Sequence, residues 1–246
     1  MKKTKLGADI CPPPDEPDLP TDLPLLENAT ALFRNREVEL HECLIENLNL
    51  VAVATSLRLE TCVLKAVKLT NGNLPNLRMR DVRLDGCDLA NVDARGLNAV
   101  RVEFLNCRMT GLRAAEADFQ NVRMLRGDQR YCQFRFGAFK SAWFESANFE
   151  EADFQGTDLR GARFLNCHLR SAEMSRVTLV GADLCGSHVE GLRLSAPDIF
   201  GATVDAPQAM VFAALLGIRI RRSAVAPKSP KLLEERGPHP ATAELA

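Results

Sequence analysis

Apolar side chains recur at every fifth residue along most of this chain. From Leu59 to Val204, 26 of the 30 residues at that spacing are large and apolar, and the exceptions are Ala94, Ala99, Ala114 and Gln129. A second column of small or medium side chains, such as Cys62 and Ala142, lies two residues before each of them. Asp, Asn, Arg, Glu, Gly and Ser dominate the remaining three positions, so two inward and three outward residues alternate along the chain.

This period predicts neither an amphipathic helix nor an ordinary strand, whose side chains repeat every 3.6 and 2 residues. The chain must instead turn a corner every five residues. Four corners make a square coil of about 20 residues, and coils stack at the strand-pairing distance of about 4.8 Å. Residues 33–204 are therefore expected to form about eight to nine coils, in a rod on the order of 40 Å long.

Two departures from the period are expected to disturb the coil. Upstream of Thr55 the same pairing lies one residue out of register, as in Val38 and Leu40, so a four-residue step to Leu59 predicts an irregular corner. The segment from Gly127 to Tyr131 is a candidate bulge, because Gln129 occupies an inward position.

The segments SANFEEADFQGTDLRGARF (146–164) and VGADLCGSHV (180–189) resemble the A(D/N)LXX repeat of the pentapeptide-repeat proteins. The resemblance is strongest over residues 132–204 and extends, more loosely, over about 170 residues. It implies an all-β solenoid, a right-handed quadrilateral parallel β-helix, and says little about function.

We divide the chain into four parts on this basis. Residues 1–30 read as a Pro-rich flexible tail, 31–204 as the β-helix, 205–222 as a C-terminal cap of helix and strand, and 223–246 as a second flexible tail. In the cap, Asp205 is a plausible N-cap and Gly217 a helix stop.

The capping helix is too apolar to have one free face. One face is expected to cover the last coil and the other to meet a second subunit; the alternative is a helix folded fully back on its own rod. The resemblance to the quinolone-resistance branch of the family, in which a C-terminal element of this kind forms a dimer, also favours a homodimer. The candidate dimer residues are Met210, Val211, Phe212, Leu215 and Leu216.

The residues with reactive side chains suggest no catalytic, cofactor or metal site. Six of the eight cysteines fall in the small inward column, there is no C-x-x-C, and Cys87 and Cys107 are the only pair expected on neighbouring coils. Cys185 faces outward and is the candidate reactive thiol. His168 and His188 are expected to stack on adjacent coils, either as a metal or pH-sensing pair or as two imidazoles without a role. We predict that the protein is not an enzyme.

Two outward groups are candidate partner surfaces. Leu105, Leu125 and Leu165 share one column, and nothing in the coil requires leucine there. Basic residues between Arg123 and Lys140 are interleaved with Tyr131 and Phe136, with Trp143 nearby. Such a mixture can bind single-stranded nucleic acid, but mutual neutralisation with the acidic coil that follows is the simpler interpretation.

These observations favour a non-enzymatic scaffold that binds a protein partner through a flat face of the rod. The resemblance offers an alternative, a DNA-mimicking protector of DNA gyrase or topoisomerase IV, but residues 33–204 contain 22 Lys and Arg and 22 Asp and Glu. A mimic of DNA needs an acidic face, so this balance counts against it. An accessory protein of a bacterial effector or secretion system is a lower alternative. No apolar leader or spanning segment is present, so we expect a cytoplasmic protein without membrane contact.

Overall fold

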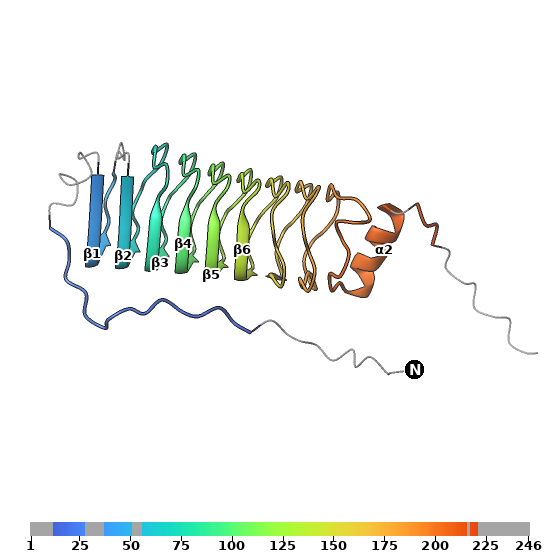
Figure 1. The fold of residues 1–246 in the computed structure, drawn as a ribbon, viewed down its shortest axis with the longest axis horizontal. Coiled ribbons are helices and arrows are strands. Elements are labelled where there is room, and N and C mark those ends of the chain that lie inside the picture. The colour runs from blue at the N-terminus through green and yellow to red at the C-terminus, as the bar shows by residue number, and fades with distance from the viewer. Residues whose placement is uncertain (1–11, 28–36, 51–55, 216, 221–246) are drawn as a thin grey trace, which may run out of the picture.

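The computed structural model describes residues 12–27, 37–50, 56–215 and 217–220, and it shows a parallel β-solenoid closed by a short helix (Figure 1). Seven strands lie in chain order in one sheet, joined by six parallel pairings. The fold class is as predicted, but regular strands account for fewer turns than eight to nine coils, because beyond β7 isolated bridges continue the register. The strands are β1 (Glu37–Glu46), β2 (Ser56–Lys65), β3 (Arg78–Asp85), β4 (Asn98–Leu105), β5 (Asp118–Leu125), β6 (Ala138–Glu145) and β7 (Arg163–Leu165).

The corners of the coil explain the period of five. Every fifth residue along one coil, such as Arg101, Asn106, Gly111 and Glu116, has a positive φ between 52° and 70°. This left-handed conformation reverses the chain direction locally, and glycine and asparagine tolerate it best. Short flat segments therefore alternate with sharp corners.

Phenylalanine fills the interior column. The rings of Phe119 and Phe139 stack with centroids 4.3 Å apart, and those of Phe144 and Phe164 lie 4.6 Å apart. Neighbouring columns meet edge to face, as Phe144 and Phe149 do at 5.1 Å. Burying each ring contributes about 1.5–3 kcal/mol, so this stack stabilises the middle of the rod.

The register step near the start of the rod is confirmed. Leu40 of β1 pairs with Leu59 of β2, an offset of 19 residues, whereas Leu59 pairs with Met79 of β3, an offset of 20. The irregular corner itself falls in 51–55, outside the described residues. The step also places Cys43 beside Cys62, with their sulfur atoms 3.6 Å apart. The expectation that only Cys87 and Cys107 are neighbours was wrong, because it ignored this offset.

No bulge forms at Gln129. The bridges of Asp128 to Arg108 and to Asn148 keep the 20-residue offset on both sides of it. Gln129 is fully buried in the interior column, and its Nε2 contacts the sulfur of Met109 at 3.7 Å. Its Oε1 has no hydrogen-bond partner among the described residues.

The helix α2 (Ala206–Leu215) covers the last coil. The backbone N–H of Gln208 donates to Asp205 Oδ1 at 2.9 Å, and the N–H of Asp205 donates to Gln208 Oε1 at 3.0 Å, which is a reciprocal cap. Gln208 Nε2 also donates to the carbonyls of Leu184 and Ser187 at 2.6 and 2.7 Å. The side chain therefore fixes the helix to the rod by hydrogen bonds.

The outward face of α2 differs from the predicted dimer set. Phe212 is only 6% exposed and packs into the rod, so its place among the dimer residues was wrong. Val211 is partly buried against the core, whereas Met210 and Leu215 are exposed. Leu216 falls outside the described residues. The strand expected after the helix is absent from 217–220. Within the described ranges, no helix combines the length and apolarity needed to cross a bilayer.

The segment 12–27 differs from the flexible tail expected for residues 1–30. It runs back along the rod from β1 toward β5 (Figure 1). Leu25 bridges to Leu44 of β1, and further along the segment Pro14 and Pro17 are buried. We call residues 12–24 the strap.

Candidate partner-binding face

The second half of each strand presents two outward columns on one flat side of the rod, which we call the strap face. One of them is the predicted leucine column. Leu105 pairs with Leu125, which pairs with Glu145, which pairs with Leu165, so the predicted alignment is what the structure shows. The three leucines are half-buried side chains at the ends of their strands.

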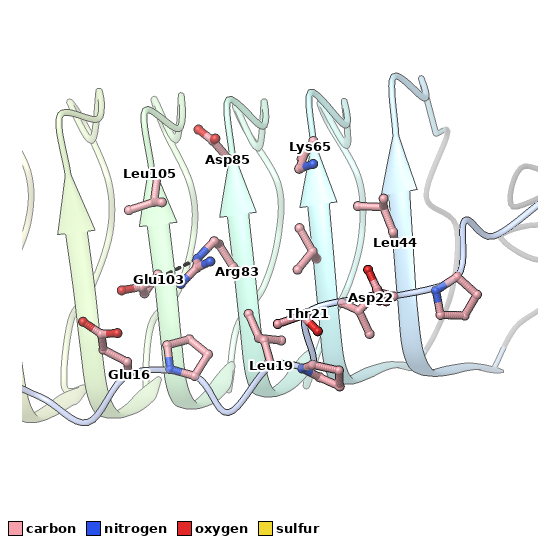
Figure 2. A pocket seen from close by; sticks show the side chains of 15 residues that line it. Glu16, Leu19, Thr21, Asp22, Leu44, Lys65, Arg83, Asp85, Glu103 and Leu105 are labelled. Atoms are coloured by element: carbon pink, nitrogen blue, oxygen red, sulfur yellow. Dashed lines mark hydrogen bonds and ion pairs between the residues drawn. The ribbon is translucent and has the colours of Figure 1, made fainter.

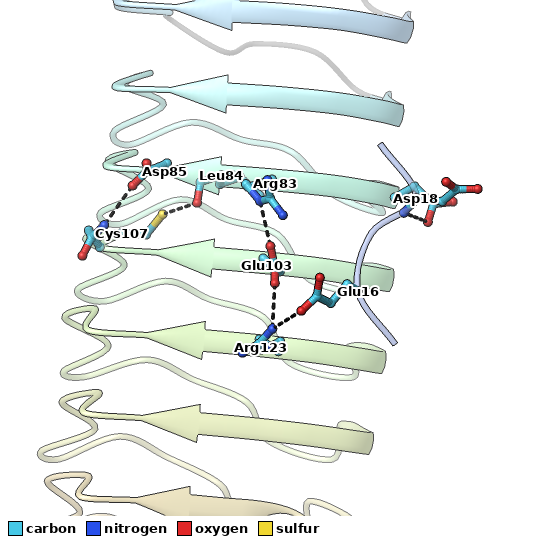
Figure 3. A network of polar contacts seen from close by, with 10 residues as sticks. Glu16, Asp18, Arg83, Leu84, Asp85, Glu103, Cys107 and Arg123 are labelled. Carbon is cyan, nitrogen blue, oxygen red and sulfur yellow. Dashed lines mark hydrogen bonds and ion pairs between the residues drawn. The ribbon is translucent and has the colours of Figure 1, made fainter. Parts of the chain in front are cut away.

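The second column alternates charged residues with an aromatic ring. It runs in register through Arg83, Glu103, Arg123, Trp143 and Arg163. Glu103 accepts hydrogen bonds from Arg83 Nε at 2.7 Å and from Arg123 Nη1 at 3.2 Å (Figure 3). The guanidinium carbon of Arg163 lies 4.8 Å from the centre of the Trp143 ring, a cation–π contact. Trp143 therefore belongs to the same face as the leucines.

The strap lies across the first half of this face. Arg123 Nη1 donates to Glu16 at 2.9 Å, and Asn121 Nδ2 donates to Asp15 at 3.0 Å. Glu103 beneath is only 4% exposed. A groove of about 1260 Å³ remains between the strap and the leucine column, and Figure 2 shows Leu105 on its wall. The face is thus partly occupied by the chain itself.

A buried ion pair supports the strap at the corner before the face. Arg101 donates two hydrogen bonds of 2.6 Å to the carboxylate of Asp81, which also accepts the backbone N–H of Asp18 at 3.0 Å. Burial acts to raise the pKa of Asp81, but these hydrogen bonds outweigh it and hold the pKa below the usual value. Asp81 therefore stays ionised where the strap contacts it.

Tyr131 and Phe136 do not join this face. They occupy two other corners of their coil, ten residues or more along the square from Asn121, and both are exposed. The Tyr131 hydroxyl donates to Glu151 of the next coil at 3.5 Å. Phe136 covers Gly156, where an added Cβ would come within 2.7 Å of its ring. These aromatic residues contact neighbouring coils and are separated from the leucine column.

The basic residues around them are largely neutralised. Arg130 pairs with Asp128 at 2.9 Å, Lys140 pairs with Asp118 at 3.4 Å, and Arg135 pairs with Asp153. This pairing is the mutual neutralisation expected from the sequence.

The remaining reactive side chains form no larger cluster. His168 and His188 stack as predicted, with ring centroids 4.7 Å apart. In the part of the chain that the structure describes, no three His, Cys, Asp or Glu side chains are grouped so as to hold a metal ion. Cys185 is partly buried, and burial together with Asp183 raises its pKa to about 11. A raised pKa disfavours the thiolate, so the predicted reactivity of Cys185 is not supported.

The strap is the part of this face that the sequence pattern did not reveal. Its residues, PPPDEPDLPTDLP, have no repeat period and six prolines, which suggested a flexible tail. The available signal was electrostatic, because four carboxylates without a basic residue match the arginines at 101 and 123.

Comparisons with known proteins agree with this repeat architecture. The family described as pentapeptide repeats matches eight copies in residues 62–98 and 139–191. Among solved structures, QnrB1, a plasmid-mediated fluoroquinolone resistance protein, is 20% identical, covering 75% of this chain and 90% of that chain, with a TM-score of 0.47. HetL, a pentapeptide repeat protein involved in heterocyst differentiation regulation from the cyanobacterium Nostoc sp. strain PCC 7120, is 18% identical, covering 69% and 87%, with a TM-score of 0.33. The search of curated protein sequences found no match. The matched repeats and the five-residue coil together identify this chain as a pentapeptide-repeat protein.

Proposed function

We propose that this pentapeptide-repeat protein is a non-enzymatic scaffold that binds a protein partner through the strap face. The observation that carries the proposal is the in-register leucine column beside Trp143 and Arg163. Leucine at these outward positions serves no evident packing purpose. Aromatic and arginine side chains beside apolar ones are typical of the centres of protein interfaces.

The rigidity of the coil also supports this function. Successive rows of the face are held at the strand-pairing distance by backbone hydrogen bonds, so a ligand meets a preformed surface. Binding to a preformed surface costs little conformational entropy. The buried free thiols, among them Cys132 and Cys167, are compatible with the reducing cytoplasm that we propose as its location.

Site-specific photo-crosslinking tests the face. A photoreactive amino acid at position 125 or 165 is expected to give one discrete crosslinked protein, identified by mass spectrometry and then re-bound as a purified protein. Replacing Leu125 and Leu165 with serine is expected to abolish that binding. Val180→Ser is the matched control, because Val180 is an exposed apolar residue on another side of the coil. Binding that survives the double substitution would contradict the proposed surface.

We also propose a homodimer formed at the C-terminal end. Exposed apolar side chains gather there, on α2 and on the segments beside it: Phe200, Met210, Leu215, Ile218 and Ile220. An exposed apolar group of this kind on a rod end is a typical association surface.

A further inference from the structure

The strap shows which chemistry the strap face accepts. It carries four carboxylates, six prolines and no basic residue over residues 12–24. Proline lacks a backbone N–H, so such a segment cannot pair as a regular strand and must bind through side chains and apolar contacts. Pro14 and Pro17 are buried, and the acidic side chains between and beside them meet polar groups of β3 to β5.

The surface beneath the strap is complementary to it. We call Asp81, Arg83, Arg101, Glu103 and Arg123 the strap track. Within the track, Arg101 neutralises Asp81, and Arg83 with Arg123 neutralises Glu103. One positive charge is therefore in excess, and it faces the strap. The hydrogen-bonded Asp81, and then the charges of the strap's Asp15 and Asp18, raise the pKa of Arg101.

The strap is held in a way that permits exchange. From Pro12 to Leu23 the described residues show one backbone hydrogen bond to the rod, that of Asp18. The Glu16 side chain is 68% exposed, and an exposed ion pair contributes little to stability. The groove between the strap and Leu105 gives a second segment room to enter beside it.

We propose that the strap track is a binding site for an acidic, proline-punctuated segment of a protein partner, which takes the place of the chain's own strap. This inference rests on the proposed function in using the same face, and it names the class of partner. The strap is then the resident competitor, and partner affinity depends on how firmly the strap is docked.

Competition by a free peptide tests the proposal on the full chain. The probe is a fluorescent peptide with the sequence of residues 12–24, measured by anisotropy. We expect saturable binding that weakens with added salt. Neutralising the strap in the protein (D15N, E16Q and D18N together) is expected to tighten peptide binding about tenfold, because the competitor loses its charged contacts. Arg123→Gln is expected to weaken it by about tenfold, because a charged hydrogen bond is lost.

Two controls separate recognition from general charge attraction. Arg108→Gln removes an exposed arginine that pairs with Asp88 on another side of the coil, and it should leave binding unchanged. A peptide with Asn and Gln in place of Asp and Glu should not bind. Melting temperatures of all variants confirm that the rod is folded.

The proposal is overturned if the peptide fails to bind both the wild-type and the strap-neutralised chain, or if the neutral peptide binds equally well. It is also overturned if strap neutralisation converts a dimer to a monomer, since the occupant is then a second copy of this chain. Peptide binding without any crosslinked partner would contradict the proposed function but not this site. A crosslinked partner without peptide binding would contradict this inference alone.

Discussion

Gln129 shows how one side chain can depart from a repeat without changing the fold. It stands in an interior column otherwise filled by apolar side chains, between Met109 and Phe149 of the neighbouring coils. The backbone register is unaffected, because hydrogen bonds between coils fix it on either side. A buried amide oxygen without a partner costs about 1–3 kcal/mol.

Replacing Gln129 with methionine is therefore expected to stabilise the protein by about 1–2 kcal/mol, because it keeps the volume and removes the buried polar atoms. Urea denaturation followed by circular dichroism measures the effect. Gln133→Met, at an exposed position in the same coil, should change stability by less than about 0.5 kcal/mol. A loss of stability on Gln129→Met would show that the amide is satisfied in solution.

Residues differ in how well the sequence predicts their role. The alignment of Leu105, Leu125 and Leu165 followed from the period alone, because the corners determine which side chains point outward. The burial of Phe212 and the exposure of Met210 did not follow, since both lie on a helix that is apolar all round. Their orientation depends on Gln208, whose amide binds two carbonyls at the end of the rod.

At the scale of elements, α2 and the strap solve different problems. The helix covers the open end of the solenoid, where unpaired backbone groups would otherwise meet water. The strap covers a face that is already complete in its backbone hydrogen bonds. Capping is predictable because every solenoid needs it, whereas the strap required knowledge of which charges meet in space.

The exposed side of α2 predicts a dimer in solution. Size-exclusion chromatography with light scattering is expected to give twice the mass of the chain. Replacing Met210 and Leu215 with serine should yield a monomer with a nearly unchanged melting temperature, because neither side chain packs into the rod. Phe212→Ala is the contrasting variant, and it should lower the melting temperature by opening a cavity under the helix. A monomeric wild-type protein would refute the dimer.

At the scale of the whole molecule, charge is balanced and locally paired. Acidic residues of the coil stand beside arginines, as Asp81 does with Arg101 and Asp93 with Arg95 and Arg113. Such pairing leaves little net field along the rod. A surface of this kind recognises its partner by local contacts and not by long-range attraction.

Because of this balance we expect no protection of DNA gyrase. Micromolar protein should fail to restore supercoiling in the presence of a fluoroquinolone, since an enzyme surface that binds DNA selects for negative charge. The wild-type chain and a variant with R123Q and R163Q should both be inactive in this assay. Restored supercoiling would instead favour the alternative of a gyrase protector.

Acid is expected to destabilise the rod below about pH 4. The hydrogen bonds of Arg130 and Arg160 lower the pKa values of Asp128 and Asp158 below the ordinary value of 3.8. A carboxyl whose pKa is lower in the folded state stabilises that state above its unfolded pKa. This stability is lost as the pH falls through the folded pKa. Melting temperatures should therefore be constant from pH 7 to about 5 and fall at lower pH, less steeply in an Asp128→Asn variant.

The offset of 19 residues between β1 and β2, against 20 elsewhere, separates two kinds of change in length. A single residue can be removed between strands while every outward column keeps its side of the square. Removing five residues would instead rotate all later columns by a quarter turn, and removing 20 would shorten the rod by one storey and keep its sides. Evolution can thus alter the reach of this molecule and the composition of each side independently.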